Sequence, residues 1–178
     1  MLISGNPEKG LAGALYKLYP DATYVHKSQG VDLTKHEHQL EFANMALEHD
    51  VIIVNSALWK FQQVLLLDVV HKKLVEHEKQ AHIVCIGSTT DRVNKGTMWL
   101  YNVDKKALRD YCNSLSILGV WDNKPRVSYI SFGTLSNNQH KHPDRKCLDI
   151  DSAASYIKWM IEQPKELHVN EISLDPIQ

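Results

Sequence analysis

The chain has 178 residues and a formal net charge of -1, and hydrophobic residues make up 43% of it. This length suits one domain with its own hydrophobic core, and the near-neutral charge excludes a surface field built for nucleic acid or for an acidic membrane. The longest apolar runs, such as residues 64–70, are too short to span a bilayer, and the N-terminal residues lack the pattern of a signal peptide.

Short apolar runs alternate with amphipathic stretches along the chain, without a low-complexity linker or an internal repeat. In chain order we predict a strand at 1–4, a helix at 10–18, a strand at 22–26, a helix at 35–49, a strand at 51–55, a helix at 61–77, a strand at 82–87, a helix at 99–118, a strand at 127–132, a helix at 151–162 and a strand at 169–174. Asp151 and Ser152 predict the N-cap of the last helix. The alternation predicts a doubly wound, parallel α/β sheet in a single domain, residues 1–178.

The first polar stretch of interest is SGNPEKGLAGAL, residues 4–15, which follows the first predicted strand and opens the first helix. Ligands of such sheets bind beyond the carboxyl ends of the strands. Glycines there permit a tight turn and a close approach of phosphate, and the helix N-terminus offers N–H groups. Gly5, Gly10 and Gly13 have one residue more than the usual spacing, so this stretch alone is equally well a turn before a helix.

Three further stretches follow or face the ends of strands. Asn55 lies in IIVNSAL (52–58), and Ser88 ends IVCIGS (83–88). Taken alone, each is most simply a turn or cap residue. In WLYNVDKKAL (99–108), Tyr101 and Lys105 lie four residues apart, which places them on one helical face. They are either a packing pair or an acid–base pair.

The order of these motifs resembles the short-chain dehydrogenase/reductase family: a glycine turn, then V-N-S-A, I-G-S and Y-x-x-x-K. RVSYISFGTL (126–135) is similar to the family's segment after its sixth strand, and residues 149–164 with 169–176 are similar to its closing helix and strand. The resemblance covers nearly the whole chain. It implies a Rossmann-like fold, an oxidoreductase that transfers a hydride between a nicotinamide cofactor and a small carbonyl or alcohol, and a homodimer or homotetramer built on helices 61–77 and 99–118.

The resemblance also implies roles for individual residues. Tyr101 would be the general acid–base, and Lys105 would lower the pKa of this phenol from its ordinary value of about 10 and hold the nicotinamide ribose. Ser88 would donate a hydrogen bond to the substrate oxygen. The cofactor-binding residues that it implies are Ser4, Gly5, Asn6, Lys9, Gly10, Leu11, Lys27, Ser28, Asp32, Leu33, Asn55, Ser56, Ala57, Tyr101, Lys105, Phe132, Gly133 and Leu135.

The chain departs from the family on the adenosine side. Only four residues separate the predicted strand at 22–26 from VDLT at 31–34. A parallel crossover needs about a dozen residues or more, so the family's next helix and third strand cannot both be present. We therefore predict a sheet of about six strands that is trimmed on this side. Asp32 in VDLT looks like the aspartate with which the family contacts adenine.

The end of the second predicted strand bears on the choice of cofactor. Lys27 and Ser28 stand there in place of a carboxylate. A cation and a hydroxyl suit a 2′-phosphate, which favours NADP(H) over NAD(H); the alternative is a solvated turn lysine. The family's relay asparagine has no clear counterpart, and Gln62 or Gln63 lies nearest.

Other functions fit parts of the pattern. The irregular glycine turn and the trimmed side also suit a catalytically inactive dinucleotide-binding or scaffold protein on the same fold. Sugar-nucleotide epimerases share Y-x-x-x-K but usually carry a sizeable C-terminal substrate domain, for which this length leaves no room. Residues 137–147 contain metal-ligand types without a second cluster nearby, so we predict a substrate loop and no metal. Three cysteines are too few for a disulfide framework and favour a cytoplasmic location.

Overall fold

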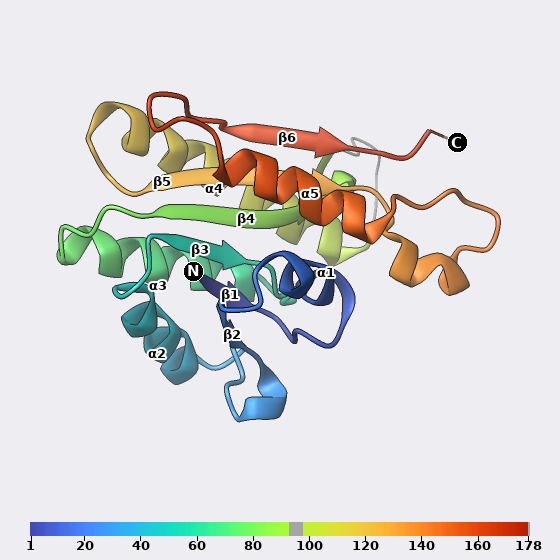
Figure 1. Cartoon of the computed structure of the whole chain (residues 1–178), viewed down its shortest axis with the longest axis horizontal. Coiled ribbons are helices and arrows are strands. Elements are labelled where there is room, and N and C mark those ends of the chain that lie inside the picture. Colours follow the sequence, from blue (N-terminus) through green and yellow to red (C-terminus); the bar gives the residue numbers. More distant parts are fainter. Residues whose placement is uncertain (93–97, 178) are drawn as a thin grey trace.

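Strands of mostly β-branched or leucine residues build the centre of the molecule. The computed structural model describes residues 1–92 and 98–177. The strands are β1 (Leu2–Ser4), β2 (Thr23–Val25), β3 (Val51–Val54), β4 (His82–Ser88), β5 (Arg126–Phe132) and β6 (Glu171–Leu174). They form one sheet in the order β2-β1-β3-β4-β5-β6, and all neighbouring strands are parallel (Figure 1). The predicted six-stranded parallel sheet is thus confirmed.

Helices cover both faces of the sheet. They are α1 (Gly10–Leu18), α2 (His36–Ala46), α3 (Gln62–Glu76), α4 (Leu100–Trp121) and α5 (Ile150–Ile161). Helices α1 and α5 pack together on one face, while α3 and α4 lie on the other, with α2 against α3 (Figure 1). Each crossover between parallel strands runs through a helix, which is the arrangement that a doubly wound sheet requires.

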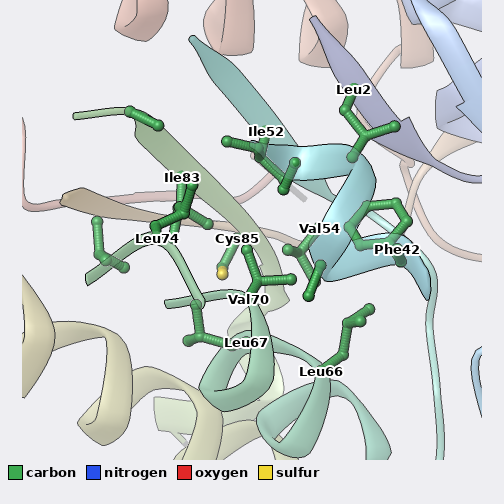
Figure 2. Close-up of a cluster of buried hydrophobic side chains, with 14 of the residues drawn as sticks. Leu2, Phe42, Ile52, Val54, Leu66, Leu67, Val70, Leu74, Ile83 and Cys85 are labelled. Carbon is green, nitrogen blue, oxygen red and sulfur yellow. The ribbon is translucent and has the colours of Figure 1, made fainter. Parts of the chain in front are cut away.

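Successive side chains of each strand point to opposite faces, and both faces are apolar. Ile52 and Val54 face α2 and α3, where they pack with Phe42 and Leu66 in the cluster that Figure 2 shows. Ile53 belongs to the second cluster, beneath α1 and α5. A strand that is buried on both sides reads as a continuous apolar run, which is why the sequence pattern located these strands.

The eleven predicted elements are all present, with ends that differ by a few residues. The predicted N-cap of the last helix is wrong. Helix α5 begins at Ile150, and the Asp149 carboxylate accepts hydrogen bonds from the backbone N–H of Ser152 (2.8 Å) and from its hydroxyl (2.9 Å). Asp151 instead lies in the first turn and pairs with Lys17 (2.8 Å).

The edge at β2 confirms the predicted trimming of the sheet. Strand β2 pairs with β1 alone, and between β2 and α2 the chain forms the short 3₁₀ turn Lys27–Gln29 and no further strand.

Within residues 1–92 and 98–177, no helix is both long and apolar enough to cross a membrane.

Candidate active site

The carboxyl ends of the central strands open onto one cleft of about 1050 Å³. Its walls are the first turn of α1, the segments that follow β3, β4 and β5, the N-terminal part of α4, and the residues just after β6. The sequence-predicted residues that line it are Asn6, Lys9, Gly10, Leu11, Asn55, Ser56, Ala57, Ser88, Tyr101, Lys105, Phe132, Gly133 and Leu135. The three predicted catalytic side chains therefore share one space.

Two predicted residues support the cleft from behind its surface. Ser4 is fully buried, and its hydroxyl oxygen accepts hydrogen bonds from the backbone N–H groups of Asn55 (2.9 Å) and Ser56 (3.0 Å). Gly5 has a φ of 144°, and a Cβ there would lie 2.6 Å from Asn55 Nδ2. Any larger residue would thus displace the asparagine, so this turn requires glycine.

Four predicted cofactor residues, Lys27, Ser28, Asp32 and Leu33, lie outside the cleft. Lys27 Nζ is 2.7 Å from the Asp32 carboxylate, and Ser28 Oγ is hydrogen-bonded to His26 Nδ1 (2.6 Å). Hydrogen bonds from Lys27 and then from Thr34 hold the pKa of Asp32 below its usual range. Leu33 is buried in the core. Lys27 and Asp32 thus bind each other and Leu33 packs inward, and contact of these four residues with the cofactor stays a prediction.

Ser88 is the last residue of β4 and lines the cleft. Its Oγ accepts from the Thr90 hydroxyl (3.3 Å), within the 3₁₀ turn η2 (Thr89–Arg92). That turn is anchored from below, where the Tyr129 hydroxyl donates to the buried Asp91 carboxylate (2.7 Å). A Cβ at Gly87 would collide with the Tyr129 hydroxyl, so glycine is required just before Ser88.

The Tyr101 phenol lies in an aromatic setting. Its ring centre is 5.2 Å from that of Trp59 and 5.0 Å from that of Trp99, and all three side chains line the cleft. Burial raises the pKa of Tyr101, while a hydrogen bond involving Ser88 acts in the opposite direction. Lys105 Nζ lies 5.4 Å from the centre of the Tyr101 ring. The pKa of Tyr101 is thus raised, opposite to the expected direction, because burial and then the Asp104 and Asp91 carboxylates disfavour the phenolate.

Lys105 is held by Gln63 and not by Gln62, and replacement of the relay asparagine by Gln63 stays a prediction. The buried Lys105 ammonium donates to Gln63 Oε1 at 2.6 Å. Gln63 Nε2 donates in turn to the backbone carbonyls of Val54 (3.1 Å) and Ile86 (2.9 Å), so its oxygen is aimed at the lysine. Burial lowers the pKa of Lys105 to about 8. Gln62 instead accepts from Gln39 (2.9 Å).

Asp104 is a supporting residue that the sequence analysis missed. Its carboxylate accepts hydrogen bonds from the backbone N–H groups of Lys60 (2.8 Å) and Phe61 (3.1 Å). Both have positive φ, 56° and 62°, which a non-glycine residue adopts only when its surroundings compensate. The carboxylate supplies that compensation and so holds Trp59 against Tyr101. An aspartate within a helix gives no local signal of such a contact.

The segment that follows β5 brings further polar residues to the cleft. Asn137, Lys141, His142 and Arg145 line it, and the sequence analysis had not placed them there individually. Within residues 1–92 and 98–177, no three or more His, Cys, Asp or Glu side chains gather as they would around a metal ion.

Comparisons with known proteins identify the fold. No protein-family model matches the sequence, and no curated protein matches it. Solved structures do match: 3-ketoacyl-(acyl-carrier-protein) reductase from Brucella melitensis complexed with NADH has a TM-score of 0.74 at 14% identity, over 98% of this chain and 95% of that one. The alcohol dehydrogenase from the archaeon Thermococcus sibiricus complexed with 5-hydroxy-NADP has a TM-score of 0.73 at 16% identity, over 97% and 94%.

A third structure names the fold directly. The short-chain dehydrogenase/reductase glucose/ribitol dehydrogenase from Brucella melitensis has a TM-score of 0.73 at 12% identity, over 98% of this chain and 94% of that one. This chain has the short-chain dehydrogenase/reductase fold. On that fold, the cleft holds a phenol, a hydroxyl and a buried amine beside the first turn of α1. Such a set can donate a proton to an oxygen and hydrogen-bond the same oxygen.

Proposed function

We propose that the protein is an oxidoreductase of the short-chain dehydrogenase/reductase type, which transfers a hydride between NADP(H) and a small carbonyl or alcohol substrate. The observation that carries this proposal is the convergence of Ser88, Tyr101 and Lys105 in one cleft. Structures of the same fold have been solved with NADH, NADP⁺ and 5-hydroxy-NADP. We place the protein in the cytoplasm, since its three cysteines form no disulfide in the structure: Cys85, Cys112 and Cys147.

The residues of the cleft fit a dinucleotide. The first turn of α1 has backbone N–H groups without intrahelical acceptors, and Gly10, Leu11 and Ala12 of this turn line the cleft. These groups and the positive end of the helix dipole suit the pyrophosphate. Asn55 and Ser56, at the end of β3, lie where the floor of the nucleotide site would be. The bound cofactor would supply or accept the hydride.

In the reduction direction, the protein's own groups handle the substrate oxygen. Ser88 Oγ would hydrogen-bond the carbonyl oxygen, and the Tyr101 hydroxyl would deliver a proton to it as the carbon gains the hydride. The raised pKa of Tyr101 keeps this phenol protonated and ready to donate. Lys105, fixed by Gln63, would hold a positive charge near the ring and hydrogen-bond the ribose.

The experiment that tests the function is a screen of aldehydes and ketones with NADPH and NADH consumption as the readout. We expect turnover with a subset of carbonyl compounds and a preference for NADPH. Tight cofactor binding without turnover of any compound would favour the inactive dinucleotide-binding protein on the same fold. Calorimetry that detects neither cofactor would contradict the oxidoreductase and favour a scaffold protein on the same fold.

A separate prediction concerns which lysine binds the phosphates of the cofactor. Lys9 lines the cleft beside the first turn of α1, whereas Lys27 is outside it and paired with Asp32. We therefore expect Lys9→Gln to weaken NADPH binding about tenfold, the size of one charge-assisted contact, and Lys27→Gln to change it less than about twofold. Titration of each variant with NADPH and NADH measures this. A larger loss of NADPH affinity in Lys27→Gln than in Lys9→Gln would indicate that Lys27 binds the 2′-phosphate.

We infer a homodimer or homotetramer from the apolar surface of two helices. Leu65 of α3 and Val103, Ile117 and Trp121 of α4 are large hydrophobic residues with 47–80% exposure. Such a surface is costly in water and marks an interface. We expect sedimentation to give a multiple of the 20.3 kDa chain, and Val103→Lys combined with Ile117→Lys to give the single-chain mass. A monomeric wild-type protein at micromolar concentration would contradict this.

A further inference from the structure

The cleft carries a charge that the chain as a whole lacks. Its lining includes five cationic side chains, Lys9, Lys105, Lys141, Arg145 and Lys146, and one carboxylate, Asp175. The Asp175 carboxylate is itself paired with Arg92 and accepts from the Thr89 hydroxyl (2.7 Å). Since the net charge of the chain is -1, the positive charge is concentrated at the cleft. A concave site of one sign attracts a ligand of the opposite sign.

Three of these cations belong to one closed loop, residues 134–148. Its ends are joined because the Leu148 N–H donates to the Thr134 carbonyl and the Ser136 N–H donates to the Leu148 carbonyl, both at 2.8 Å. Inside the loop, the Gln139 amide donates to the carbonyls of His142 and Arg145, again at 2.8 Å. The backbone that carries Arg145 is thus fixed before any ligand binds, which reduces the entropy cost of binding.

The loop begins beside the reacting groups. In the register of β4 and β5, Ser88 is the partner of Phe132, and the loop leaves β5 just beyond that residue. Among the ion pairs of residues 1–92 and 98–177, none involves Lys141 or Arg145. Both therefore place a positive charge without an ion-pair partner in the lining of the cleft that also contains Ser88.

We propose that the substrate carries an anionic group, a carboxylate or a phosphate, which Lys141 and Arg145 bind while its carbonyl faces Ser88 and Tyr101. This inference rests on the proposed oxidoreductase function. A guanidinium fork matches both anions, and the lysine adds a point charge. Trp59 and Trp99 offer an apolar wall to the remainder of the molecule. Lys9, at the first turn of α1, is left for the cofactor phosphates.

The test uses three aromatic aldehydes with the same reactive group: 4-formylbenzoate, its uncharged methyl ester and 4-formylphenyl phosphate. For wild type, Lys141→Gln and Arg145→Gln, we measure kcat/KM with each aldehyde and the Kd of NADPH. Lys158→Gln removes one charge from α5, where Lys158 pairs with Glu162 outside the cleft, and is the matched control. The two anionic arms distinguish a carboxylate from a phosphate as the preferred group.

We expect wild type to prefer one or both anions over the ester, and each cleft variant to lose about 30-fold in kcat/KM for that anion, with the ester and the control unchanged. An equal loss for the ester, or no preference for either anion, would overturn the inference. The loop also reaches Gly10, where Asn137 Nδ2 is 3.4 Å from the position of a Cβ. A loss confined to the Kd of NADPH would thus overturn it in favour of cofactor phosphates.

A binding readout separates this inference from the proposed function. Trp59 and Trp99 line the cleft, so quenching of tryptophan fluorescence reports occupancy without turnover. If no aldehyde is reduced but 4-formylbenzoate still binds in preference to its ester, and Arg145→Gln removes that preference, the oxidoreductase proposal fails while the anion site stands. If the aldehydes are reduced and the binding shows no dependence on charge, the anion site fails alone.

Discussion

Replacing Tyr101 with phenylalanine is expected to lower kcat by about 1,000-fold while the Kd of the cofactor changes less than about twofold. The phenol hydroxyl is the proton donor of the proposed reaction, and a positioned general acid contributes about 10²–10⁴ in rate. The ring itself would keep its contacts with Trp59 and Trp99, because the substitution removes only the hydroxyl oxygen. Stopped-flow measurement of NADPH oxidation and a fluorescence titration give the two quantities.

Tyr156→Phe is the matched control for this experiment. Tyr156 lies on α5 and is 44% exposed, away from the cleft. We expect its kcat to equal that of wild type. If Tyr101→Phe retained wild-type kcat, the phenol would not be the proton donor, and the proposed mechanism would fail at its central step.

Gln63→Leu is expected to damage both stability and activity. It removes the acceptor of Lys105 and leaves the Val54 and Ile86 carbonyls without their side-chain donor. A buried polar group that loses its partner costs about 1–3 kcal/mol, so we expect the free energy of unfolding to fall by about 3 kcal/mol. Urea unfolding measures this loss.

The pH profile shows whether Gln63 acts through Lys105. Gln63 Oε1 accepts a hydrogen bond from the charged form of the lysine and so favours that form. Burial already lowers the pKa of Lys105 to about 8, so in wild type the ammonium loses its proton as the pH rises through that value. Removing the acceptor lowers this pKa further. We therefore expect the alkaline fall of kcat/KM to begin at a lower pH in Gln63→Leu.

Gln62→Leu separates this effect from a general loss of helix α3 packing. Gln62 is the neighbouring residue, and within residues 1–92 and 98–177 its side chain is hydrogen-bonded to Gln39 alone. We expect a smaller loss of stability, about 1 kcal/mol, and an alkaline limb at the wild-type pH. An unshifted limb in Gln63→Leu would mean that this glutamine serves the structure alone.

Local patterns in the sequence were enough to predict the fold. A strand buried on both faces needs a continuous apolar run, and a helix on a sheet needs one apolar stripe, so residues 51–54 and 62–76 could be located without any tertiary information. The trimmed edge also followed from spacing in the sequence, because the four residues between the predicted strand at 22–26 and VDLT at 31–34 cannot make a crossover. The carboxyl ends of parallel strands meet at one edge, which placed Ser88 and Asn55 near each other in advance.

Only the tertiary structure determined which side chains contact one another. The Lys27–Asp32 pair, the contact of Gln63 with Lys105 and the hold of Asp104 on the turn that carries Trp59 each depend on side-chain direction. The last two join residues more than 40 positions apart, which no periodicity encodes. The direction of the Tyr101 pKa shift depends mainly on burial, and burial exists only once the chain is folded. Sequence by itself determined the fold and the groups near the cleft; only packing determined their partners and their protonation.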